Sequence, residues 1–286
     1  MSRELTKALK LFSLDKVDRD IYCWSGESVG YGRIFGGQVM AQSLMAAYET
    51  VDKSRLAHSF HSYFLRPGDM KRKIIFDVDR IRDGKSFTTR RVRAIQNGEA
   101  IFNCSISFQI NEKGLSHQTT MPKVPGPDDL ESEWSIRYKN RSKVKKKYLS
   151  MWLRKREFEI RHVETQDLLR SKKTPPYRNT WIKPTGKLPS DQKLHQAFLL
   201  YVSDIGLVTT MSNPHGISFM SKKFQSASLD HVMWFHKKVN FNHWLLYSVE
   251  SPVSSGARGF ARGAIYTKSG NLIASTAQEG LIRLWD

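Results

Sequence analysis

Three polar side chains in the last third of the chain have types that could move a proton together. Asp204 has Leu200 and Leu207 about one helical turn away on either side, and burial there would raise the pKa of its carboxyl and make it a general base. Gln278 alternates with small and apolar residues, so strand periodicity points its amide inward. Ser228, just before a predicted strand, adds a hydroxyl. An exposed or hydrogen-bonded Asp204 and a Gln278 satisfied by backbone remain open alternatives.

Other hydrolytic chemistries have less support in the sequence. Ser228 has no Gly-x-Ser-x-Gly elbow and no assigned His-Asp pair, which argues against a serine hydrolase. The closely spaced histidines are His58 with His61 and His231 with His236. Neither pair forms a His-Glu-x-x-His motif, and the two cysteines, Cys23 and Cys104, are far apart. We therefore expect no metal site, no organic cofactor and no disulfide framework.

Two apolar periodicities predict the helices that position these residues. The first follows Gly36 and Gly37 and consists of Met40, Leu44, Ala47 and Val51. The second consists of Leu194, Phe198, Tyr201, Ile205 and Val208. We interpret the first as a helix with one apolar face whose glycines permit close backbone approach. The second predicts a single helix that includes Asp204.

Strand patterns follow each predicted helix. Residues 100–110 alternate between apolar and mostly polar side chains, and Asp83-Gly84 and Asn97-Gly98 supply hairpin turns before them. Residues 229–250 and 271–278 give further strands, the latter after a turn at Ser269-Gly270. The order helix, then antiparallel strands, occurs twice, and weak similarity between the Asn97 and Ser269 turns favours a duplication. The fold class is therefore α+β.

The repeated order divides the chain of 286 residues into three parts. We expect an N-terminal module over residues 1–112 and a C-terminal module over 191–286 that carries the candidate catalytic residues. Residues 113–190, rich in proline and positive charge, would connect them. Aromatic residues such as Trp152 and Trp181 would pack this connection against the modules, and we interpret its basic runs at 141–147 and 154–156 as solvated.

The overall charge bears on partners and location. The chain has 46 Lys and Arg against 27 Asp and Glu, a net charge of +19, which suits an anionic partner. A nucleic acid is one such partner, but no nucleic-acid-binding motif occurs, so we expect none. The N-terminal residues include no apolar run of signal-peptide length, and no 18 apolar residues occur in succession. These features predict a cytoplasmic protein without membrane insertion.

Five segments resemble the acyl-CoA thioesterase II (TesB-type) family. They are residues 32–42 (GRIFGGQVMAQ), 61–69 (HSYFLRPGD), 82–92 (RDGKSFTTRRV), 229–236 (LDHVMWFH) and 274–280 (ASTAQEG). The resemblance implies a double hot-dog fold, in which each module wraps an antiparallel sheet around a long central helix. It also implies hydrolysis of fatty acyl-CoA to free fatty acid and coenzyme A without metal or organic cofactor, and a homo-oligomer, dimer or tetramer. Peroxisomal relatives end in Ser-Lys-Leu, whereas this chain ends in Arg-Leu-Trp-Asp, which also favours the cytoplasm.

Carried over onto matching positions, the resemblance assigns the catalytic residues as Asp204, Ser228 and Gln278, which would hold a water for attack on the thioester. Backbone N–H groups around Gly37 and Gln38 are expected to stabilise the oxyanion. The alternative is a non-catalytic acyl-CoA sensor or carrier on the same fold.

Basic residues at the end of the third matched segment are candidates for the phosphates of coenzyme A. Arg90 and Arg91 are expected to contact them, with Arg93 beside them. An ordinary charged strand face is an equally good interpretation.

Overall fold

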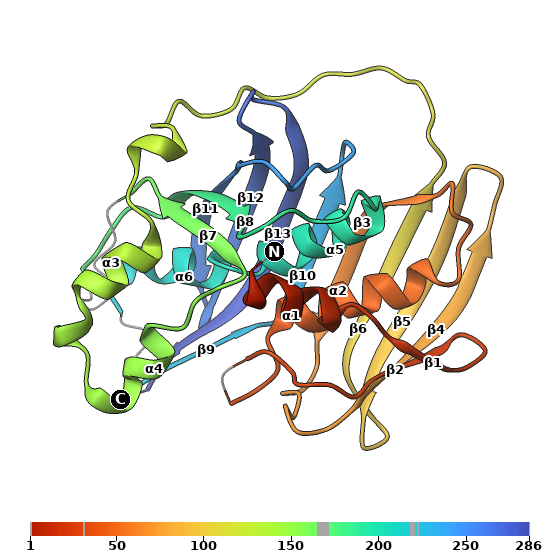
Figure 1. Ribbon diagram of the computed structural model, residues 1–286, viewed down its shortest axis with the longest axis horizontal. Helices are drawn as coiled ribbons and strands as arrows, with labels where there is room; N and C mark the ends of the chain where they lie inside the picture. The colour runs from red at the N-terminus through yellow and green to blue at the C-terminus, as the bar shows by residue number, and fades with distance from the viewer. Residues whose placement is uncertain (1, 31, 165–171, 218–220, 222, 286) are drawn as a thin grey trace.

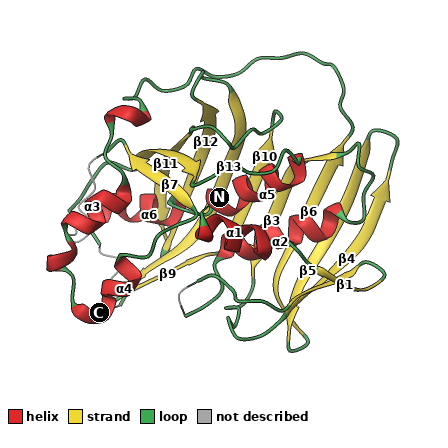
Figure 2. Ribbon diagram, in the orientation of Figure 1, coloured by secondary structure: helices red, strands yellow, loops and turns green. Residues whose placement is uncertain are grey.

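One antiparallel sheet runs through the whole molecule. The computed structural model describes residues 2–30, 32–164, 172–217, 221 and 223–285. Over this part of the chain the strands join into a 13-stranded sheet, with some helices in front of its central part and others beyond one edge (Figure 2). The first half contributes β1 (Asp15–Asp18), β2 (Ile21–Trp24), β3 (Leu56–Phe64), β4 (Ile74–Asp83), β5 (Phe87–Gln96) and β6 (Glu99–Gln109). The second half contributes β7 (Phe158–His162), β8 (Tyr177–Pro184), β9 (Phe224–Ser228), β10 (Asp230–Phe235), β11 (Leu245–Ser255), β12 (Arg258–Thr267) and β13 (Leu272–Leu284).

The strand order shows that the two halves repeat one another. The sheet runs β1-β2-β4-β5-β6-β3 and then β10-β13-β12-β11-β8-β7, with β9 beside β13. The second series is the first in reverse, so β3 corresponds to β10 and β6 to β13. The halves meet where β3 pairs with β10, in a register that places Phe60 opposite Met233 and Ser62 opposite His231. The predicted α+β class and the predicted duplication both agree with this order.

Two central helices lie side by side in front of this sheet (Figure 1). The helices of the chain are α1 (Arg3–Leu11), α2 (Gly36–Tyr48), α3 (Glu133–Lys139), α4 (Leu149–Trp152), α5 (Gln192–Ser203) and α6 (Leu207–Ser212), with short 3-10 turns η1 (Pro127–Asp129), η2 (Arg141–Lys143), η3 (Lys146–Tyr148) and η4 (Asn213–His215). The prediction of one apolar face on α2 is wrong, because this helix is buried almost all round. The sheet covers one side, α5 a second, and α1 a third, where Gln42 Nε2 donates to the carbonyl of Leu11 at 2.8 Å.

The second predicted helix does not continue through Asp204. α5 ends at Ser203, and Asp204 is its C-cap rather than an interior residue. Gly206 then has φ +103°, a left-handed conformation that interrupts the helical path before α6 begins. Ile205 and Val208 therefore do not continue the apolar stripe of α5. The break matters because it turns the Asp204 side chain toward the N-terminus of α2.

The predicted connection over residues 113–190 needs correction in its second half. β7 and β8 extend the sheet beside β11, and they correspond to β1 and β2 of the first half. The alternation of apolar and polar residues along these strands is hard to see in the sequence, because Pro175, Pro176 and Pro184 interrupt it. The expected packing of the aromatic anchors is found, since Trp152 is 8% and Trp181 2% exposed.

The described part of the chain holds no helix with the length and apolarity required to cross a membrane.

Candidate active site

One helix end and two paired strands of the second half bring the three candidate residues together, beside the start of α2 from the first half. Asp204 caps α5, Ser228 ends β9, and Gln278 lies in β13, where β9 and β13 pair with Ser228 opposite Gly280. Gln278 Nε2 donates to Ser228 Oγ at 2.9 Å, and Ser228 Oγ donates to Asp204 Oδ1 at 3.3 Å. The backbone N–H of Gly37, in the first turn of α2, donates to Asp204 Oδ2 at 3.1 Å. The three predicted residues thus form one hydrogen-bonded chain ending on a carboxylate.

The glycines at the start of α2 make this approach possible. A Cβ on Gly36 would lie 2.6 Å from Asp204 Oδ2, and a Cβ on Gly37 would lie 2.2 Å from the carbonyl oxygen of Tyr201. Both distances are shorter than any tolerated contact. Side chains at either position would therefore push α2 and the end of α5 apart, which explains the Gly-Gly pair that the sequence places at the opening of this helix.

The surroundings of Asp204 change its acidity. The residue is partly buried between the helix ends, and its loss of hydration raises the pKa of the carboxyl from 3.8 to about 7. Hydrogen bonds from Gly37 and Ser228, and the positive charge of Arg33, oppose this rise. A carboxyl with a pKa near neutrality can take a proton from water and release it again, as a general base must.

A fourth residue, His231, orients Gln278 and was not among the predicted site residues. Its ring is wholly buried in β10, with Nδ1 2.6 Å from Gln278 Oε1 and Nε2 2.9 Å from Ser203 Oγ. Burial lowers the pKa of His231 to about 4, so the ring is neutral near pH 7. With its proton on Nδ1 the ring donates to Oε1, which leaves the Gln278 NH₂ group facing Ser228. The sequence shows His231 only as a strand position, because the pairing of β10 with β13 that brings it to Gln278 joins segments far apart in the chain.

Substitution of His231 tests this orienting role. We expect His231→Leu to lower kcat about 10- to 100-fold with little change in KM, because Gln278 Oε1 loses a buried donor. His231→Asn keeps an amide N–H near the position of Nδ1 and should recover most of the activity. Steady-state kinetics of both variants, with thermal unfolding as a check on the fold, make the measurement. Equal losses in the Leu and Asn variants would show that His231 only fills space.

The two predicted contributors from the start of α2 have other partners. The N–H of Gly37 is directed at Asp204, and the N–H of Gln38 donates to the carbonyl of Phe35 at 3.0 Å. The Gln38 side chain is wholly buried, with Oε1 accepting from Val29 N at 2.6 Å and Nε2 donating to Ser28 Oγ at 3.2 Å. The prediction of Gln38 as a substrate contact is therefore wrong. Its amide instead fastens the preceding loop to the helix.

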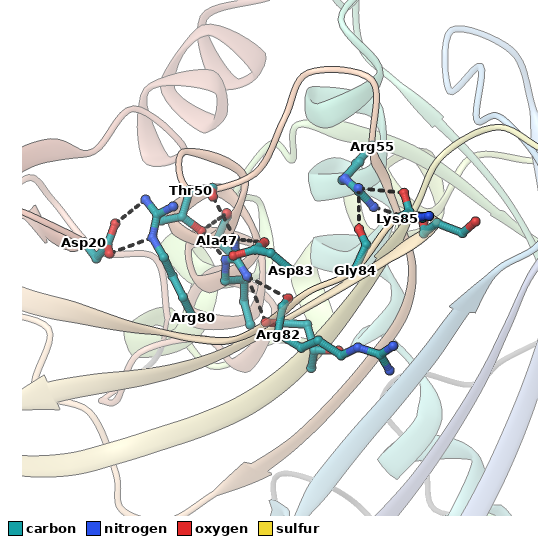
Figure 3. A network of polar contacts seen from close by, with 12 residues as sticks. Asp20, Ala47, Thr50, Arg55, Arg80, Arg82, Asp83, Gly84 and Lys85 are labelled. Carbon is teal, nitrogen blue, oxygen red and sulfur yellow. Dashed lines mark hydrogen bonds and ion pairs between the residues drawn. The ribbon is translucent and has the colours of Figure 1, made fainter.

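The prediction that Arg90 meets coenzyme A is also wrong. Arg90 is 1% exposed, and its guanidinium donates to Thr50 Oγ1 at 2.8 Å and to Asp83 Oδ1 at 2.6 Å. Its Nη1 donates to the carbonyls of Arg82 and Thr89. Figure 3 shows Thr50, Arg82 and Asp83 in this network, which ties the end of α2 to the β4–β5 hairpin.

Arg91 is exposed, but it lies on the face of the sheet that points away from the central helices. Alternation along β5 buries Val92 against the helices and turns Arg91 away from them, where it pairs with Asp79 at 2.6 Å. The neighbouring Arg93 pairs with Asp77 in the same way at 2.5 Å. Arg91 and Arg93 therefore form an ordinary charged strand face, the alternative that the sequence left open, while Arg90 of the same strand points inward.

Known family patterns match both halves of the chain. The sequence pattern described as "Acyl-CoA thioesterase N-terminal domain" matches residues 26–109, and the one described as "Acyl-CoA thioesterase" matches residues 151–281. "Acyl-CoA thioesterase 2" of Haemophilus influenzae is 38% identical over 99% of both chains. The chain belongs to the acyl-CoA thioesterase II family. "Acyl-coenzyme A thioesterase 8" of Mus musculus is another relative, 37% identical over 96% of this chain and 88% of its own length.

Solved structures of the family and of a more distant protein are similar in fold to this chain. The acyl-CoA thioesterase II TesB2 of Mycobacterium marinum is 37% identical, with a TM-score of 0.77 over 96% of this chain and 97% of that one. A hot-dog-fold protein of unknown function from Alicyclobacillus acidocaldarius is only 17% identical but has a TM-score of 0.78 over 99% of each chain, a likeness of fold alone. The predicted family and the predicted double hot-dog fold are thereby confirmed.

Proposed function

We propose that this member of the acyl-CoA thioesterase family hydrolyses fatty acyl-CoA to free fatty acid and coenzyme A by direct attack of a water. The proposal rests on one observation above all. Asp204, with a pKa near neutrality, ends a chain of hydrogen bonds through Ser228 and Gln278 at the junction of α2 and α5. A protein that only binds acyl-CoA has no need of a carboxyl with a raised pKa that is hydrogen-bonded to two further polar side chains. This disfavours the sensor or carrier.

Each residue has a separate task in the proposed reaction. Asp204 accepts a proton from water while the water oxygen forms a bond to the thioester carbonyl carbon. Ser228 and Gln278 hold that water in line, which removes much of the entropic barrier. The C–S bond then breaks and the sulfur leaves as a thiolate, for which a thiol pKa of about 8.5 makes a strong general acid unnecessary. The proton on Asp204 passes to the departing sulfur and restores the carboxylate.

The acidity of Asp204 predicts the pH dependence of the reaction. The base works only when ionised, so kcat/KM should rise with pH and level off above about 7, falling about tenfold per unit below it. His231, with a pKa of about 4, adds no ionisation in this range. Thiol release measured between about pH 5.5 and 9 gives the profile. A profile that is flat through neutrality would mean that Asp204 is not the base.

The direct test is thiol release by the purified chain across a series of acyl-CoA chain lengths. Release by the wild type and loss of release in Asp204→Asn are expected. Binding of acyl-CoA without release would instead indicate the carrier. The same preparation tests the expected homo-oligomer, a dimer or tetramer, by analytical ultracentrifugation.

A further inference from the structure

A cleft beside α1 has no role in the chemistry described so far. Two cavities, of about 730 and 330 Å³, share Glu4, Arg154 and Lys155 in their walls, and we refer to them together as the α1 cleft. One wall is α1, which lies in front of α2 and α5 (Figure 1). The opposite wall comes from residues 154–160, just before and within β7. The volume is that of a site for a sizeable organic ligand.

The larger part of the α1 cleft reaches the helix junction that carries Asp204. Its walls include Tyr201, whose carbonyl oxygen lies directly against Gly37, the residue that donates to Asp204. They also include Val29 and Gly30. Val29 is the residue that Gln38 fastens to the first turn of α2. The cleft and Asp204 thus share one helix, since Tyr201 lies about one turn before Asp204, the C-cap of α5.

The cleft has a basic rim and an apolar interior. Its cations are Arg3, Lys7, Lys10, Arg154 and Lys155 in the larger part and Arg137 and Arg156 in the smaller part. Within the described residues, no acidic side chain forms an ion pair with Lys7, Lys10, Arg154 or Lys155, which are all exposed. Leu11, Trp24 and Met70 supply apolar surface behind them.

Of the five acidic residues in the walls, Glu133, Glu157 and Glu159 have partners in the fold, whereas Glu4 and Glu27 form no ion pair within the described residues. Glu157 is 9% exposed and accepts from the Tyr201 hydroxyl at 2.5 Å, so it lies inside the cleft and not at its exposed rim. Glu133 is held by Arg137 and His162. Glu4 and Glu27 lie among five cations of the larger part, Arg3, Lys7, Lys10, Arg154 and Lys155, so the rim keeps an excess of positive charge.

We propose that the α1 cleft binds the phosphorylated nucleotide end of coenzyme A, with Lys7, Lys10, Arg154 and Lys155 around its phosphates. The proposal rests on the proposed function, because it presumes that acyl-CoA is the substrate. A phosphate monoester and a diphosphate at the end of a long flexible arm match a group of exposed cations in a cleft that extends to α5, the helix whose C-cap is Asp204. The basic run at 154–156 is then a binding element rather than a solvated linker.

The test compares two substrates that differ only in the nucleotide. The double variant Lys7→Glu/Lys155→Glu should raise KM for acyl-CoA on the order of tenfold and leave KM for the matching acyl-pantetheine unchanged. Lys145→Glu/Lys146→Glu makes the same change in charge on exposed residues outside the cleft and should leave both values unchanged. Adenosine 3′,5′-bisphosphate should raise the unfolding temperature of the wild type and of the control but not of the cleft variant.

Several outcomes would overturn the proposal. An equal rise of KM for both substrates would mean that the cleft holds the pantetheine arm or the acyl chain, and an equal rise in the control would mean a diffuse effect of net charge. Unchanged values in the cleft variant, with no difference in its response to the bisphosphate, would also contradict it. Failure of the wild type to release thiol from either substrate would refute the proposed function instead, while the bisphosphate measurement would still decide on the cleft.

Discussion

Replacing Asp204 by Asn is expected to lower kcat by about 10³- to 10⁴-fold near pH 8, with KM changed little. The Asn side chain keeps the shape of Asp204 and an oxygen that can accept from Gly37, but it cannot take a proton from water. Binding of acyl-CoA should persist, since the carboxylate is proposed to act on the water and not on the bound substrate. Thiol-release kinetics at saturating and limiting acyl-CoA separate the two effects.

Stability measurements test whether Asp204→Asn loses activity merely because the variant unfolds. The folded-state pKa of Asp204 is about 7, above the ordinary value of 3.8, so between these values the unfolded chain has lost the proton that the folded chain keeps. Stability therefore falls as pH rises through this window and stays lower above it. Asp204→Asn should be at least as stable as the wild type at pH 8. A loss of activity accompanied by unfolding at pH 8 would contradict this account.

Asp230→Asn is a matched control for Asp204. Asp230 also lies beside the site, and burial likewise raises the pKa of its carboxyl. Its Oδ1 accepts from the backbone N–H of Glu279 at 2.7 Å, a contact that an amide oxygen can preserve. We expect this variant to keep nearly full turnover. A similar loss in both variants would mean that charge in the region, rather than proton transfer by Asp204, limits the reaction.

Gln278→Ala is expected to lower kcat by about 10²-fold, again with a small effect on KM. The change removes the NH₂ group that donates to Ser228, and Ser228 is then free to turn away from Asp204. It also leaves His231 Nδ1 with a buried proton and no acceptor. Steady-state thiol release measures the loss.

Gln278→Glu tests whether the amide group of Gln278 is required or only its shape. The carboxylate has the same shape and accepts from His231, but it cannot donate to Ser228, and its charge would raise the pKa of Asp204 further. We expect a loss of kcat at least as large as for Ala and a pH profile shifted upward. Full activity in the Glu variant would remove the proposed role of the NH₂ group.

Local patterns predicted those parts of the fold that depend on local physics. The Asn97-Gly98 turn between β5 and β6 has φ +52° and +78°, as an Asn-Gly hairpin should, and the alternation over residues 100–110 coincides with β6. The apolar spacing after Gly36 located α2. The resemblance named Asp204, Ser228 and Gln278, and the structure brings these three side chains into hydrogen-bond contact.

The remaining features depend on contacts between distant segments. The end of α5 cannot be read from the stripe that continues to Val208, because only a left-handed Gly206 breaks it. The inward direction of Arg90 runs against the usual exposure of arginine, and it is stable only because oxygens from Thr50 and Asp83 surround the guanidinium. His231 acquires its role through β13, far away in the sequence, and no local pattern contains that partner.

The reversed strand order has a consequence for stoichiometry. In the first half, β3 and β6 occupy the places that β10 and β13 occupy in the second, and there the cross-strand neighbours Phe60 and Ile106 are both apolar and wholly buried. A dimer of identical single modules would carry two equivalent reaction centres. In the fused chain the first copy has apolar side chains at these positions, so the proposed chemistry is confined to one centre per polypeptide, to which the first half contributes the start of α2 at Gly36 and Gly37.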